Sequence, residues 1–123
     1  MIGYVTMGTN DIAKAAPFYD ALAKELGVGR FMDFGSFIAW GNPTTGGAGF
    51  AIAQPHDKKA ATVGNGSMAA FTAKDKAQVD RLHALALSLG GTCEGPPGPR
   101  SDNFYAAYFR DLDGNKLNAF VMS

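Results

Sequence analysis

The chain has 123 residues, enough for one domain with a substantial core. Its 11 basic and 11 acidic side chains leave no formal net charge, and no basic block is present, so we expect no binding to nucleic acid or to a membrane surface. No stretch is apolar over the ~18 residues that a membrane span needs, and we expect no signal peptide. The single cysteine, Cys93, excludes a disulfide within the chain, which favours a cytoplasmic location.

The first half of the chain is predicted to form a strand, a helix and further strands. A β-strand is expected over Tyr4–Met7, and a helix is expected to begin after Asp11, whose carboxylate can cap free amides. Apolar residues at helical spacing then continue to Gly27. Two strands, Phe37–Trp40 and Gly49–Ile52, follow and are joined by a turn that contains proline and glycine.

The second half of the chain repeats this order. After a predicted linker at His56–Gly66, a strand is expected over Met68–Phe71 and a helix after Asp75. Residues Gly95–Asp102 contain three prolines and are predicted to be a loop that folds over a pocket. We expect the thiol of Cys93 to be buried or half-buried.

A hairpin is predicted at the C-terminal end of the chain, around the turn Asp111–Asn115, where Gly114 suits the left-handed position. If Asp111 and Asn115 close this turn, strand alternation separates the flanking residues onto two faces. One face then carries Ala106, Tyr108, Asn118 and Phe120, and the other carries Ala107, Phe109, Leu117 and Ala119.

These elements form two copies of one unit. At an offset of 64 positions Tyr4 matches Met68 and Asp11 matches Asp75, whereas at an offset of 68 Trp40 matches Tyr108 and Phe50 matches Asn118. A duplicated unit predicts a single domain over 1–123 with a site between the copies. The predicted organisation is module 1 over 1–55, a linker over 56–66 and module 2 over 67–123.

The two βαβββ modules, the segment Tyr4–Asp11 with Phe18-Tyr19, and the segment Tyr105–Lys116 resemble the vicinal oxygen chelate superfamily. The glyoxalase/bleomycin-resistance branch is the most similar. The resemblance implies an α+β fold in which curved mixed sheets surround a cavity, and it implies a homodimer. It also implies one of several functions: lactoylglutathione lyase, extradiol dioxygenase, thiol transferase or metal-free drug binding.

The family's enzymes hold a divalent metal with His, Gln or Glu at four related places. Carried onto this chain, the resemblance puts Tyr4, Phe50, Met68 and Asn118 at those places. These side chains offer no imidazole and no carboxylate, so they are poor ligands, and we expect neither metal nor cofactor. The histidines His56 and His83 are expected to be solvated or partly packed, outside the site.

The residues therefore favour a binding protein for a small apolar or aromatic molecule. Aromatic rings and a few hydrogen-bonding groups suit such a ligand. The alternative is a metal-dependent enzyme of the superfamily with ligands at other places. The predicted ligand-binding side chains are Tyr4, Thr6, Trp40, Phe50, Met68, Tyr108, Asn118 and Arg100, the last for an anionic group.

Overall fold

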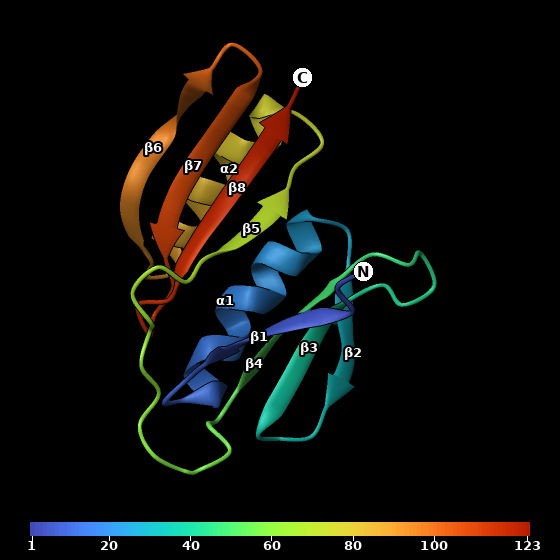
Figure 1. Cartoon of the computed structure of the whole chain (residues 1–123), viewed down its shortest axis with the longest axis vertical. Coiled ribbons are helices and arrows are strands. Elements are labelled where there is room, and N and C mark those ends of the chain that lie inside the picture. The colour runs from blue at the N-terminus through green and yellow to red at the C-terminus, as the bar shows by residue number, and fades with distance from the viewer. The chain divides into compact units, whose positions relative to one another are not determined.

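The computed structural model describes all 123 residues and divides the chain into two compact units, 1–64 and 65–123. Both have the order strand, helix and three strands, which can be followed along each unit in Figure 1. Unit 1 consists of β1 (Tyr4–Gly8), α1 (Ile12–Glu25), β2 (Gly29–Asp33), β3 (Phe37–Gly41) and β4 (Gly49–Ala53). Unit 2 consists of β5 (Ala69–Thr72), α2 (Lys76–Ser88), β6 (Thr92–Ser101), β7 (Phe104–Arg110) and β8 (Lys116–Met122).

The sheets of the two units have the same topology. Their strand orders are β1-β4-β3-β2 and β5-β8-β7-β6, and in each sheet the first two strands are parallel and the other neighbours antiparallel. This confirms the predicted α+β fold of two βαβββ units with mixed sheets. Neither helix has the length and apolar character to cross a membrane.

Both helices begin where the sequence predicts. The side chain of Asp11 accepts a hydrogen bond from the amide of Lys14 at 3.1 Å, and Asp75 accepts one from the amide of Gln78 at 2.8 Å. Each aspartate satisfies an amide that has no partner within its own helix, which stabilises a helix by about 1 kcal/mol.

Each unit has its core between its helix and one face of its sheet. In unit 1 the ring of Tyr19 lies 5.5 Å from that of Trp40 and 4.8 Å from that of Phe50. In unit 2 the buried α2 residues Val79 and Leu82 pack with the sheet, where Phe109 and Leu117 are also buried. The opposite face of each sheet carries no helix of its own unit, and we call it the open face.

The C-terminal hairpin confirms the predicted register. Tyr108 pairs with Asn118 and Phe109 with Leu117, as the turn Asp111–Asn115 requires. The amide of Asp111 donates to the carbonyl of Asn115 at 3.0 Å, and Gly114 has a φ of 90°. Because the α2-facing residues of β7 include Phe109, strand alternation places Tyr108 and Asn118 on the open face.

The predicted equivalence of residues between the β3–β4 and β7–β8 hairpins is wrong by one residue in each strand. Trp40 pairs with Phe50, and both lie against α1, as Phe109 and Leu117 of unit 2 lie against α2. Trp40 is therefore equivalent to Phe109 and not to Tyr108, and the equivalent of Asn118 is Ala51. A shift of one residue exchanges the two faces of a strand, which moves Trp40 and Phe50 into the core.

The prediction of a loop over Gly95–Asp102 is also wrong, because residues 92–101 form the strand β6. β6 is an edge strand, and its pairing with β7 is interrupted by register shifts between Cys93 and Gly95, between Gly95 and Gly98, and between Pro99 and Ser101. Proline lacks an amide hydrogen, and an edge strand with bulges tolerates this because part of its backbone needs no partner.

Candidate functional site on the open sheet faces

The open face of unit 1 holds two of the predicted ligand-binding side chains. Tyr4 and Thr6 alternate with Val5 along β1, and Tyr4 is 53% exposed, with its ring 6.0 Å from that of Phe37. Trp40 and Phe50, by contrast, are only 4% and 8% exposed and lie under α1. The structure therefore does not bring Trp40 and Phe50 together with Tyr4 and Thr6.

Trp40 also takes part in a polar network on the helix side of unit 1. Its indole Nε1 donates to Asp20 at 2.8 Å, and the guanidinium of Arg30 lies 5.8 Å from the ring. Arg30 bonds Asp20 through Nε at 2.8 Å and Nη2 at 2.7 Å, and Asp33 through Nη1 at 2.9 Å. The hydrogen bonds from Arg30 lower the pKa of Asp20, against the opposing effect of burial. This network fixes Trp40 as part of the core.

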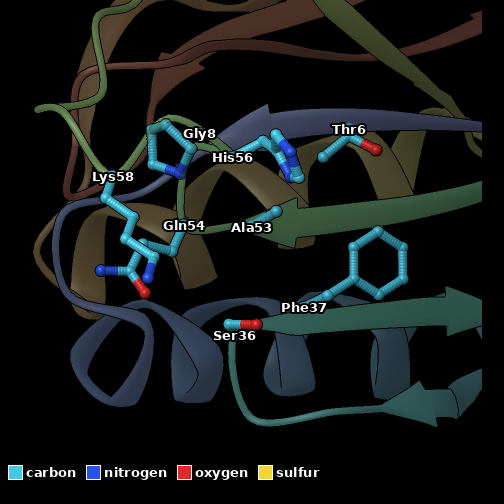
Figure 2. A pocket seen from close by; sticks show the side chains of 9 residues that line it. Thr6, Gly8, Ser36, Phe37, Ala53, Gln54, His56 and Lys58 are labelled. Atoms are coloured by element: carbon cyan, nitrogen blue, oxygen red, sulfur yellow. The ribbon is translucent and has the colours of Figure 1, made fainter.

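A pocket of about 640 Å³ opens on the open face of unit 1. Figure 2 shows Thr6, Ala53 and Phe37 beside it, from the middle of β1, the end of β4 and the start of β3. The chain after β4 completes the lining, which also includes Gly8, Ser36, Gln54, Pro55, His56 and Lys58. An aromatic ring, two hydroxyls, an amide, an imidazole and an ammonium thus surround one space.

Hydrogen bonds hold the segment after β4 beside the pocket. The amide of Gln54 donates to the carbonyl of Ser36 at 2.9 Å, and the amide of Lys58 donates to the carbonyl of Pro55 at 2.9 Å. Further on, the amide of Ala61 donates to the side chain of Asn10 at 2.7 Å. His56 therefore lines a pocket, where the sequence predicts only a solvated linker histidine. The sequence signal for this position is that His56 follows Ala53, the last residue of β4, by only three residues.

The open face of unit 2 carries Tyr108, Asn118 and Arg100. The guanidinium carbon of Arg100 lies 5.3 Å from the centre of the Tyr108 ring, so these two predicted residues are in contact. Asn118 is 1% exposed, and its amide nitrogen donates to the carbonyl of Ala107 at 3.3 Å. Met68 lies just before β5 and is exposed.

The side chains at the family's metal places do not suit a divalent metal. With the corrected equivalence between the units these places are Tyr4, Ala51, Met68 and Asn118, which supply a phenol, a methyl group, a thioether and a buried amide. None is an imidazole or a carboxylate, the ligands that compete well with water for such ions. The structure also contains no group of three or more His, Cys, Asp or Glu side chains placed to hold a metal ion.

His83 and Cys93 form a pair on the helix side of unit 2. His83 Nε2 lies 3.2 Å from the Sγ atom of Cys93, and burial lowers the pKa of His83. His83 is buried, whereas Cys93 is exposed, contrary to the prediction of a buried or half-buried thiol. Cys93 is exposed because it belongs to the edge strand β6.

Comparison with known proteins relates this geometry to one family. A model of the Glyoxalase/Bleomycin resistance protein/Dioxygenase superfamily matches residues 1–119. A glyoxalase/bleomycin resistance protein from Albidiferax ferrireducens T118 is 41% identical, with a TM-score of 0.88 over 98% of this chain and 97% of that chain. Among curated proteins, none matches significantly.

Two more distant structures share the fold. A glyoxalase/bleomycin resistance protein/dioxygenase family enzyme from Burkholderia phytofirmans PsJN is 20% identical, with a TM-score of 0.78 over 98% of both chains. A lactoylglutathione lyase from Agrobacterium tumefaciens is 21% identical, with a TM-score of 0.71 over 98% of this chain and 92% of that chain.

Proposed function

Because the chain belongs to the Glyoxalase/Bleomycin resistance protein/Dioxygenase superfamily, we propose that it binds a small apolar or aromatic molecule without a divalent metal. The observation that carries this proposal is the pocket of about 640 Å³ on the open face of unit 1. Its volume lies within the range of about 300–1,000 Å³ that is usual for small-molecule sites.

The lining of the pocket suits a ligand that is mainly apolar with a few polar atoms. The ring of Phe37 and the side chains of Ala53 and Pro55 provide apolar contact. The hydroxyls of Thr6 and Ser36 can each donate or accept one hydrogen bond, which would orient the ligand. An aromatic molecule that covers Phe37 would gain most of its binding energy from the apolar surface that both remove from water.

The metal-free part of the proposal follows from the donor set. A cation held by the phenol of Tyr4, the thioether of Met68 and the amide of Asn118 would have no charged ligand and no nitrogen ligand. Such a site cannot compensate for the water that the ion loses on binding. The family's metal-dependent reactions would therefore need ligands from elsewhere.

The proposal is tested by a fragment screen on the complete chain with matched variants at two phenylalanines. Phe37→Ala removes an aromatic contact from the pocket, and we expect it to weaken the best aromatic fragment about tenfold or more. Phe34→Ala is the control, because Phe34 stacks on Phe37 with ring centres 6.3 Å apart but is 73% exposed and lies outside the pocket lining. Equal losses for both variants, or no aromatic fragment bound near Thr6, would contradict this site.

Metal analysis of protein purified without chelators separates the proposal from the enzyme alternative. We expect less than stoichiometric zinc, nickel, iron or manganese. One equivalent of any of these metals, lost on replacement of Tyr4 or Asn118, would refute the metal-free proposal. In that case a lyase, dioxygenase or thiol transferase would take its place.

A further inference from the structure

Two cationic side chains flank one tyrosine ring on the open face of unit 2. The guanidinium of Arg100 lies 5.3 Å from the centre of the Tyr108 ring, and the Nζ atom of Lys116 lies 5.6 Å from it. Both distances are within the ~6 Å at which a cation is attracted to an aromatic face. The ring of Tyr108 on β7 therefore attracts one cation from β6 and one from β8.

The backbone of β6 is shaped around Arg100. Its Nη1 atom donates to the carbonyl of Gly98 at 2.9 Å and its Nη2 atom to the carbonyl of Pro96 at 2.8 Å. A Cβ atom at Gly95 would lie 3.1 Å from Nη2 of Arg100, and one at Gly98 would lie 3.3 Å from Nη1. Both glycines thus leave the space that the guanidinium occupies. A guanidinium has five N–H donors, so fixing it in this way leaves further donors in a defined direction.

Neither of these cations forms an ion pair with a carboxylate. Two arginines on other strands form ion pairs. Arg30 pairs with Asp20 and Asp33, and the Nε atom of Arg110 lies 2.7 Å from Oε1 of Glu94. Arg100 and Lys116 form no ion pair. The hydrogen bond from Arg110 has the largest effect in lowering the pKa of Glu94, and the charge of Lys116 helps to lower it, so Glu94 offsets part of the positive charge on this face. Arg100 has no carboxylate bonded to it.

Aromatic surface lies beside this charge. Phe104 and Phe120 project on the same face as Tyr108 by strand alternation, and their rings stack with centres 5.5 Å apart. Ala106 lies between Phe104 and Tyr108 on β7, pairs with Phe120 and is fully buried. Positive charge and aromatic rings are therefore neighbours on one surface.

We infer that the open face of unit 2 binds aromatic carboxylates, with Arg100 contacting the carboxylate, Lys116 adding positive charge beside Tyr108, and the Phe104–Phe120 pair contacting the ring. A carboxylate can accept hydrogen bonds from a guanidinium through both oxygens, and bonds between charged groups are stronger than neutral ones. This inference goes beyond the proposed function, because it assigns a second ligand site, on unit 2, and gives the ligand class of that site as aromatic acids.

The experiment uses pairs of compounds that differ only in charge, such as benzoate with benzamide and 1-naphthoate with 1-naphthamide. Binding to the complete chain is followed by amide chemical shifts in ¹⁵N-labelled protein. We expect each acid to bind about tenfold more tightly than its amide, since hydrogen bonds to charged groups exceed neutral ones by roughly this factor. The shifts should concentrate on Gly95, Gly98 and Arg100, and the preference for the acid should shrink as salt is added.

Three variants test the assigned residues, and one serves as a control. Arg100→Ala and Lys116→Gln should each lower the preference for the acid at least threefold. Gly95→Ala keeps the net charge but displaces the guanidinium, so it should have the same effect. Lys76→Gln is the matched control, because the Nζ atom of Lys76 also lies 5.6 Å from a tyrosine ring, that of Tyr105, whose hydroxyl bonds Asp80 of α2 on the other face. It should leave the preference unchanged.

The outcomes separate this inference from the proposed function. If amides bind as tightly as acids, or if Lys76→Gln acts like Lys116→Gln, the inference is wrong while small-molecule binding stands. If neither acids nor amides bind anywhere on the chain, both fail. An Arg100→Ala protein that does not fold leaves Gly95→Ala and Lys116→Gln to decide, and unchanged selectivity in both would overturn the inference.

Discussion

The same kind of residue has different roles on the two faces of these sheets. Trp40 and Tyr108 are both aromatic residues near the ends of equivalent strands, β3 and β7. Trp40 is 4% exposed under α1 and hydrogen-bonded to Asp20, whereas Tyr108 lies on the open face between two cations. The exposure of each side chain and the groups that it contacts, more than its residue type, decide whether Trp40 or Tyr108 can contact a ligand.

Because Trp40 is buried, we expect it to contribute to the stability of the fold and not to ligand binding. We expect Trp40→Ala to lower the free energy of unfolding by about 3–5 kcal/mol, because it leaves a cavity under α1. Trp40→Phe should cost about 1–2 kcal/mol, because it mainly removes the hydrogen bond to Asp20. Urea unfolding followed by circular dichroism measures both. A Trp40→Ala protein of unchanged stability that no longer binds fragments would place Trp40 in the site after all.

His83 should make unit 2 sensitive to acid. Burial lowers the pKa of His83 in the folded chain, partly opposed by Asp80, below the value of about 6.5 that the unfolded chain has. The unfolded chain therefore binds the proton more readily, so the stability that His83 contributes is complete above about pH 6.5 and is lost as the pH falls toward its lowered pKa.

Thermal unfolding of the wild type and of His83→Gln between pH 7.5 and pH 5 tests this expectation. The wild type should lose more stability over that range than His83→Gln. His56→Gln is the control, since His56 is exposed beside the pocket, and its pH dependence should match that of the wild type. Parallel curves for the wild type and His83→Gln would show that His83 does not carry the effect.

At the scale of elements, the turn between β7 and β8 fixes the register of unit 2. Asp111 Oδ1 accepts hydrogen bonds from the amides of Asp113 at 2.9 Å and Asn115 at 2.8 Å, and Oδ2 accepts one from the side chain of Asn115 at 2.9 Å. Both Asp111 and Asn115 are buried. The turn between β3 and β4, residues 42–48, contains no carboxylate that could act in this way.

Asp111→Ala should therefore destabilise unit 2 markedly. It leaves buried donors without acceptors, which we expect to cost about 3 kcal/mol in the free energy of unfolding. Asp102→Ala provides the comparison, because Asp102 is an exposed aspartate in the turn between β6 and β7. This substitution should change the free energy of unfolding by less than about 0.5 kcal/mol. Chemical denaturation compares the two variants, and similar losses would mean that the Asp111 network contributes little.

At the scale of the whole molecule, each sheet ends in a parallel edge strand, β1 or β5. Tyr4 and Val5 on β1 are exposed, as is Met68 just before β5. Apolar side chains along an unpaired strand edge favour association, because pairing between two chains removes the side chains and the unpaired backbone groups from water. We therefore expect a two-fold homodimer.

Light scattering at micromolar concentration should give twice the chain mass of 12.9 kDa. Val5→Lys should shift the protein toward the monomer, because a charge on the edge of β1 opposes pairing. Leu87→Lys on α2 replaces a residue of similar exposure, 38% against 39% for Val5, and should have no such effect. A wild-type mass of one chain would rule out the dimer.

The sequence alone determined the features that depend on local chemistry. The duplicated βαβββ order, the helix starts at Asp11 and Asp75, and the two faces of the β7–β8 hairpin follow from capping residues, periodicity and a turn with one favourable geometry. Each of these signals lies within a few residues of the structure that it specifies.

Only the tertiary structure decided the features that depend on distant partners. The burial of Trp40 and Phe50 under α1 is set by packing with Tyr19, because the pairing of two strands puts opposite residues on one face but does not fix which face the helix covers. The proline-rich segment around Arg100 is a strand because it pairs with β7 at the edge of the sheet, where prolines are tolerated. His56 reached the pocket because hydrogen bonds at Gln54 and Ala61 hold its segment there, and no local pattern encodes contacts over such separations.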